Sequence, residues 1–421
     1  DAELTLNYVD AKGDTGLDLG INARPLIEGR GRGNGIAFRL TPAEPIIAFQ
    51  KFHFVDNSDW IYLHKNMRVY ANVDMDSEDG LCFRMQSDRS DTVSLQNINL
   101  ELIRFRLDKL SGILPYMPRI TGLFSAEANY IQTATSLQVS AEAGVEKLTY
   151  ERQPVGNIGL GATWLPGDKG THYLNAYFRS GDQEVLTADA VLTQKNGRDS
   201  LEVNTTFEHF PLSLANAFMP DQVVTFTGDI DGGLYINGDM EKPKMSGDLS
   251  LDSVSVYARQ AGARYWFDNR PLKIENNQLI FNKFAIYTTS RNPFTIDGNV
   301  DFRNMDRPTA NLTLRAQNYT LLDAPRTRES MLYGKIFVDL NATVRGPLDG
   351  LTMRGNMNLL GNTDVTYVLT DSPLTVEDRL GELVTFTSFT DTTSVQATEV
   401  PTMLILAPTA VVVWNWKVEV T

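Results

Sequence analysis

One acidic run has the residue types of a calcium-binding loop. The run Asp74–Gly80 holds four carboxylates within seven residues. In a calcium loop that begins at Asp74, the turn glycine and the bidentate acid would stand where this chain has Asp79 and Met85. The run Gly228–Gly233 has the same flaw. We therefore expect an acidic hairpin turn and no metal site.

A glycine- and arginine-rich run, Gly29–Gly35, has the composition of a phosphate cradle or an RNA-binding segment. No strand–loop–helix context with a P-loop lysine surrounds it, so we expect a glycine-rich turn. The chain has 38 basic and 52 acidic residues and a formal charge of −14. Neutralising phosphates needs clustered Lys and Arg, so this balance argues against a nucleic-acid partner.

Nucleophiles and metal ligands are few and scattered. The four histidines, His53, His64, His172 and His209, stand in separate segments, and Cys82 is the only cysteine. None has metal-site spacing, and a nucleophile elbow and a dinucleotide fingerprint are missing. A glycosidase carboxylate pair could hide among the acids. We expect no catalytic, cofactor or metal residues, and we expect Cys82 to point outward from a strand.

The elements that would position any site are strands. Alternation with a period of two runs through Met67–Met75, Leu137–Val145, Val224–Ile230, Phe294–Phe302, Ala310–Ala316 and Ile336–Val344. Alternate side chains of a strand point to opposite faces, so each run has one apolar face. Asp-Gly and Asn-Gly pairs between such runs indicate an antiparallel meander. Short helices are expected only at Phe105–Pro115 and Leu212–Pro220, with a weaker version at Leu321–Pro325.

Three glycines mark an internal repeat. Gly122, Gly228 and Gly334 are evenly spaced, since 228 − 122 = 106 and 334 − 228 = 106. A fixed period means that similar units stack on their neighbours. We predict a preceding segment, three repeat units and an apolar tail of uncertain register, with bounds 1–105, 106–211, 212–317, 318–400 and 401–421.

A one-sided sheet of this length must cover its apolar face. Twisted open sheets rarely exceed about 10 strands without curling or splitting. We predict an all-β fold, an elongated and curled antiparallel sheet that forms an open hydrophobic groove. The predicted groove-lining residues are Met67, Val69, Val73, Leu137, Val139, Val224, Phe226, Ile230, Leu234, Ile236, Phe294, Ile296, Val300, Leu312, Leu314, Ile336, Val338, Leu340 and Val344.

The order of punctuation residues resembles a known family. A helix ending in Leu114-Pro115 or Met219-Pro220 precedes a repeat glycine, a strand and a hinge, as in Gly238–Gly247 and Gly346–Gly355. This order is similar to the AsmA-like proteins and especially to TamB, the translocation and assembly module protein. Val365–Leu374 also resembles the late part of TamB proteins from Bacteroides-like bacteria. The resemblance covers roughly residues 90–395.

The resemblance implies a β-groove in the periplasm of a Gram-negative bacterium. It implies phospholipid acyl chains as cargo, an outer-membrane β-barrel assembly protein as partner and an anchor in the inner membrane. Leu4–Tyr8 already alternates, so we expect targeting and anchoring segments upstream of this chain. The apolar run between Thr402 and Trp416 is too short for a bilayer span, which needs about 20 residues.

Two other functions stay open at the level of sequence. The first is a scaffold that helps outer-membrane proteins to assemble by offering its sheet edge. The second is a polysaccharide-binding β-solenoid, although solenoid coils repeat every 20–30 residues or so.

Overall fold

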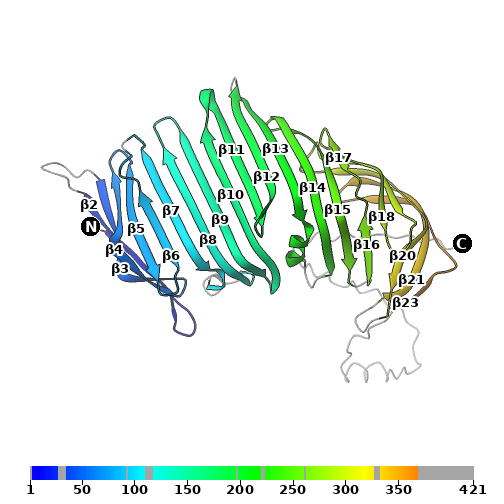
Figure 1. Cartoon of the computed structure of the whole chain (residues 1–421), viewed down its shortest axis with the longest axis horizontal. Helices are drawn as coiled ribbons and strands as arrows, with labels where there is room; N and C mark the ends of the chain where they lie inside the picture. Colours follow the sequence, from blue (N-terminus) through cyan, green and yellow to red (C-terminus); the bar gives the residue numbers. More distant parts are fainter. Residues whose placement is uncertain are drawn as a thin grey trace, which may run out of the picture.

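The strands of this protein form one sheet. The computed structural model describes residues 2–26, 35–91, 93–109, 117–195, 198–219, 223–259, 262–326 and 332–367. Its strands belong to a single 23-stranded sheet, and every pairing in it is antiparallel. The predicted all-β, curled antiparallel sheet is confirmed. Figure 1 shows the strands side by side along the long axis, in chain order.

The first twelve strands are β1 (Ala2–Val9), β2 (Thr15–Leu26), β3 (Gly35–Ile47), β4 (Gln50–His64), β5 (Val69–Ser77), β6 (Cys82–Ser87), β7 (Gln96–Arg106), β8 (Ile120–Gln132), β9 (Leu137–Tyr150), β10 (Gln153–Pro166), β11 (Thr171–Ser180) and β12 (Gln183–Lys195). The other eleven are β13 (Arg198–Pro211), β14 (Val224–Asp239), β15 (Lys244–Ala258), β16 (Ala263–Phe267), β17 (Leu272–Glu275), β18 (Gln278–Tyr287), β19 (Phe294–Asp301), β20 (Thr309–Ala324), β21 (Leu332–Pro347), β22 (Thr352–Leu359) and β23 (Asp364–Tyr367).

The connectivity is a meander with two broken strands. Almost every strand pairs with the next along the chain. The exceptions are β16 and β17, which lie end to end between β15 and β18, and β22 and β23, which both pair with β21. A solenoid stacks coil upon coil instead, so this topology excludes the polysaccharide-binding solenoid.

Three short 3-10 helices interrupt the described chain. They are η1 (Leu107–Lys109), η2 (Asp168–Gly170) and η3 (Leu212–Phe218). Two of them fall in the predicted helical segments, although 110–116 and 220–222 lie outside the described residues. The helix expected at Leu321–Pro325 is wrong. Leu321–Ala324 ends β20 instead, because Leu322 and Ala324 pair with β21, which satisfies their backbone.

The repeat glycines stand near the starts of three long strands. Gly122 lies in β8, Gly228 in β14 and Gly334 in β21. Six strand positions separate each pair if β16 and β17 count as one: β8–β13 in the first interval and β14–β20 in the second. All three have a positive φ, at 141°, 86° and 112°. The predicted unit boundaries stay predictions; 105/106 and 317/318 fall within β7 and β20.

Bulges recur along the sheet and bend it. At five of them, one residue with a positive φ donates its backbone N–H to a side chain of the neighbouring strand. The pairs are Arg104 with Ser125, Lys147 with Asn157, His209 with Asp231, Lys283 with Asp297, and Asn318 with Asp339. A bulge adds one residue to one strand, which bends the sheet and increases its twist. The recurring bulges therefore account for the curl.

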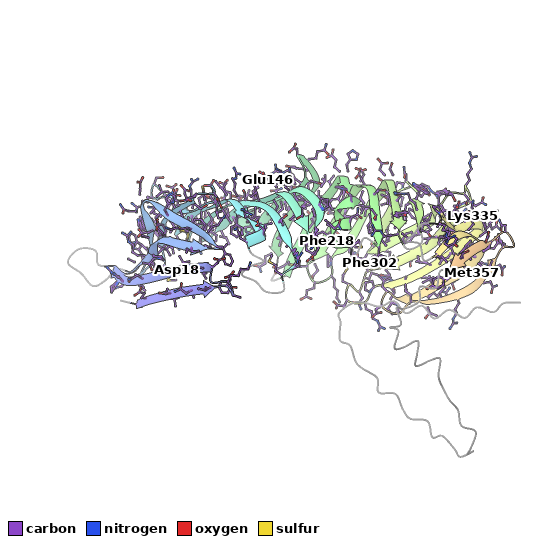
Figure 2. The ribbon with its side chains drawn as sticks, turned by 90° about the horizontal axis from the view of Figure 1, so that it is seen from below. Asp18, Glu146, Phe218, Phe302, Lys335 and Met357 are labelled. Carbon is purple, nitrogen blue, oxygen red and sulfur yellow. The ribbon has the colours of Figure 1, made fainter. Side chains whose placement is uncertain are left out.

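Near both ends of the sheet, apolar side chains are buried against one another. One buried cluster lies near the N-terminal end, around Phe52, Val73, Met75 and Leu81. Two others involve β16, β20 and β21 near the C-terminal end. Figure 2 shows the strands near Asp18 and Met357 on the same side of the central strands that carry Glu146. Both ends thus curl toward one face.

Candidate functional site

The pairing register shows that one face of the sheet is apolar from β5 to β21. Residues directly opposite each other in an antiparallel pair point to the same face. One such row runs through Val73, Met85, Leu100, Ala128, Ala141, Ala162, Ala176, Ala188, Thr205, Leu234, Gly247, Ile274, Leu279, Val300, Ala310 and Gly346. Thr205 is the single polar residue of this row.

The predicted lining residues lie on this apolar face with one exception. Paired sets such as Phe294–Ala316–Leu340 and Ile296–Leu314 place the predicted residues of β19–β21 together. Met67 is the exception. It lies in the turn before β5 and is 69% exposed, because its N–H bonds to the carbonyl of His64 and the strand begins only at Val69. Contact of the others with lipid stays a prediction.

The apolar face is covered at the ends and open in the centre. Val338 in β21 is 2% exposed and Val73 in β5 is 1% exposed. On the central strands Leu160 is 53% exposed and Leu137 is 38% exposed. The described residues of β8–β14 contribute to no buried core cluster. Large exposed apolar patches mark sites of interaction, so the central face is the candidate site.

Aromatic rings gather on the central face where the strands bulge. The ring centroids of Phe178 and Phe207 lie 6.0 and 5.9 Å from that of Phe210. Trp164 stacks on His172 at 4.9 Å. These rings bring apolar area to the face.

Helix η3 closes one side of this region. The Asn216 side chain accepts a hydrogen bond from the Phe226 N–H and donates one to its carbonyl, at 2.7 and 2.8 Å. Phe218 packs against Tyr150 of β9, with ring centroids 4.9 Å apart. Figure 2 shows Phe218 near the middle of the molecule. The helix is therefore fixed to both β9 and β14.

The opposite face carries several ion pairs. Arg84 lies between Asp74 at 3.2 Å and Glu101 at 3.0 Å. Asp74, a carboxylate of the predicted acidic hairpin, is thus paired with an arginine, and Gly80 closes the turn with a φ of 77°. Within the described ranges no group of three His, Cys, Asp or Glu could hold a metal ion.

Cys82 and the histidines form no catalytic set in the described part of the chain. Cys82 pairs with Asp76 and Ile103 on the polar face, as predicted. Burial and a hydrogen bond with Asp76 raise the pKa of its thiol to about 11, which disfavours the reactive thiolate. His209 lies at a bulge, with Nδ1 3.3 Å from Asp231. Residues 27–34 and 368–421, which include most of the glycine-rich run and the apolar tail, lie outside the described residues.

Sequence reasoning missed several apolar residues of the central face. Leu160, Ala162 and Trp164 alternate with small or polar residues, but glycines at 159 and 161 disguise the run. Phe178, Phe207 and Phe210 were missed because bulges shift the alternation around them. A search that allowed one extra residue per strand would have found them.

A family model agrees with these features. The model described as the TamB C-terminal domain matches residues 282–410. The chain is TamB-like. No curated protein and no solved structure matches it. The TamB family belongs to the Gram-negative envelope, where it takes part in protein assembly and lipid transport as a non-enzymatic module. None of the described helices is long and apolar enough to cross a membrane.

Proposed function

We propose that this chain forms part of a periplasmic conduit that carries phospholipid acyl chains between the inner and outer membranes. The observation that supports it most directly is the register row from β5 to β21, which is apolar except for Thr205 and lies open over the central strands. The TamB match supports the envelope location.

The energetics favour an open apolar groove for this task. Removing one CH₂ group from water gains about 0.8 kcal/mol, so a long acyl chain crosses water very slowly without a carrier. A continuous apolar face replaces water along the whole path. The open side leaves the charged head group hydrated, which avoids the cost of burying it.

The partners of the conduit follow from the TamB likeness. An outer-membrane β-barrel assembly protein would receive one end of the groove, and an inner-membrane anchor would hold the other. The family's role in envelope biogenesis supports both assignments.

A scaffold for outer-membrane protein assembly is the second candidate. It is favoured by the edge that β22 and β23 form among the described strands, where Leu359 is 62% exposed and Tyr367 is 59% exposed. An exposed strand edge can pair with an incoming strand by β-augmentation. In this function the edge acts and the apolar face only supports it.

Two adjacent residues of β14 separate the candidates. Ile236 points to the apolar face, paired with Val203 and Met245, whereas Tyr235 points to the other face and is 36% exposed. We expect Ile236→Asp to abolish phospholipid transfer between donor and acceptor vesicles, with Tyr235→Asp as its control. Circular dichroism confirms folding. Normal transfer by Ile236→Asp would reject the conduit, and loss of outer-membrane protein assembly with intact transfer would favour the scaffold.

A further inference from the structure

The middle of the open face has a floor of small side chains. Five successive strands, β8 to β12, place an alanine at the same register position. These residues, the alanine floor, are Ala128, Ala141, Ala162, Ala176 and Ala188. Neighbouring strands lie about 4.8 Å apart, so the floor is roughly 19 Å long and crosses the strands.

Bulky residues flank the alanine floor on both sides. The row on one side contains Tyr130, Val139, Trp164 and Leu174 on β8–β11, and its side chain is small on β12, where Ala190 stands. The row on the other side contains Leu160, Phe178, Leu186 and Phe207 on β10–β13, and it is lower on β8 and β9, where Ala126 and Ala143 stand. Each row lies two residues from the floor along its strand. The two rows are therefore four residues apart, and about 13 Å separates their Cα atoms along a strand. The result is a slot between two walls.

The small residue at 128 is specific to the first repeat unit. The positions related to Ala128 by the period of 106 carry larger residues, since 128 + 106 = 234 and 234 + 106 = 340 give Leu234 and Leu340. Both leucines point to the same apolar face. The fold therefore accepts leucine at this position, and the small residue at 128 serves something other than the sheet itself.

We propose that the alanine floor seats one hydrocarbon chain of a lipid, lying along the slot and across the strands. This inference rests on the proposed lipid conduit and names the place where a single acyl chain is held. Thr205, which follows Ala188 in the register row, marks one end of the seat. Leu100, which precedes Ala128, marks the other.

The shape and charge of the slot fit an acyl chain better than a protein segment. A helix with its side chains is about 10–12 Å wide and does not enter between walls whose own side chains fill much of 13 Å or so. A peptide strand would leave its backbone N–H and C=O groups without partners on an apolar surface. The floor and both walls, from β8 to β13, carry no charged side chain in the described structure. An uncharged, slender chain satisfies all three constraints.

The test fills the floor without making it polar. Ala128→Leu copies the residue found at 234 and 340, and Ala162→Leu fills the centre of the slot. Ala2→Leu adds the same carbons to the same face on the exposed strand β1, as a matched control. Binding of a fluorescent sixteen-carbon fatty acid to the purified chain is measured for each. We expect both floor variants to bind at least tenfold more weakly and Ala2→Leu to bind like wild type.

Any other outcome would contradict the proposal that the alanine floor holds an acyl chain. Equal or stronger binding by the floor variants would mean that the fatty acid adheres to the apolar face in general, which leaves the conduit intact. Failure of wild type to bind the fatty acid, together with its failure to transfer phospholipid between vesicles, would reject the conduit itself. Dimers of wild type that dissociate in Ala162→Leu would show that a second copy of the chain occupies the slot.

Discussion

The central strands and the C-terminal strands carry the same alternation but use it differently. In β18–β21 the apolar face curls upon itself, and Tyr319, Val338 and Ala342 are 2% exposed. In β8–β14 the same face stays open, and Leu160 is 53% exposed. One pattern of residues thus provides a core at the end of the sheet and a surface in its middle. The degree of curl decides which.

A charge on the apolar face should give the largest contrast between the two regions. Val338→Asp leaves an uncompensated charge in a covered site, which costs roughly 3–5 kcal/mol of unfolding free energy. Leu160→Asp stands in water and should change that free energy by about 0.5 kcal/mol or less. Urea unfolding of both variants measures this. Equal losses would show that the centre is covered too.

Substitution of the repeat glycines should give the next-largest difference in stability between the two regions. A Cβ at Gly334 would lie 2.2 Å from the backbone oxygen of Asp364, which cannot move away. A Cβ at Gly122 would meet the Val145 side chain at 2.7 Å, which can shift. Both glycines have a positive φ, so each change to alanine costs about 1–3 kcal/mol. We expect Gly334→Ala to lose more stability than Gly122→Ala in the same urea experiment, and the reverse order would mean that the central bend is the tighter one.

The bulge hydrogen bonds should give a smaller difference. Asp339 accepts the Asn318 N–H at 2.7 Å with a carboxylate, whereas Ser125 accepts the Arg104 N–H at 3.0 Å with a hydroxyl. Hydrogen bonds to charged groups contribute about 1.5–3 kcal/mol and neutral ones about 0.5–1.5 kcal/mol. Thermal unfolding of Asp339→Ala and Ser125→Ala should show the larger loss for the aspartate. If both losses are equal, exposure to water has cancelled the advantage of the charge.

Thiol reactivity should give the smallest effect, one that leaves stability unchanged. The raised pKa of Cys82, about 11, keeps the thiol protonated at pH 8, so it should alkylate slowly and faster as the pH approaches 11. In a Cys82→Ser background, Leu160→Cys should react with iodoacetamide at least tenfold faster than Val338→Cys. Similar rates would argue that both parts of the apolar face are equally open.

The sequence predicted which residues form the apolar face, but not where that face is covered and where it stays open. Strict alternation in Ile336–Val344 fixes which side chains share a face, because the period of a strand is two. The self-covered ends could not be predicted, since they depend on bulges such as the one at Asn318, whose positive φ leaves no mark in the hydrophobic pattern. Met67 was assigned to a strand because it continues the alternation by one step into a turn.

The alanine floor also escaped the sequence pattern. Alanine counts as apolar at Ala141 as it does at a core position, so alternation alone gives no sign of a groove. The floor emerges only when the register places five alanines in one row. The pairing register decides which residues of different strands lie side by side, and each bulge shifts that register by one residue. The row could therefore not be read from the sequence alone.

Photo-crosslinking in cells tests the central claim, that lipid occupies the open apolar face, most directly. Leu160 in β10 is 53% exposed on the apolar face, and Tyr173 in the neighbouring β11 is 45% exposed on the opposite face. A photoreactive residue is placed at one position or the other, and mass spectrometry identifies the adducts. We expect phospholipid adducts at 160 and few at 173. Equal yields at both positions, or protein adducts alone at 160, would contradict it.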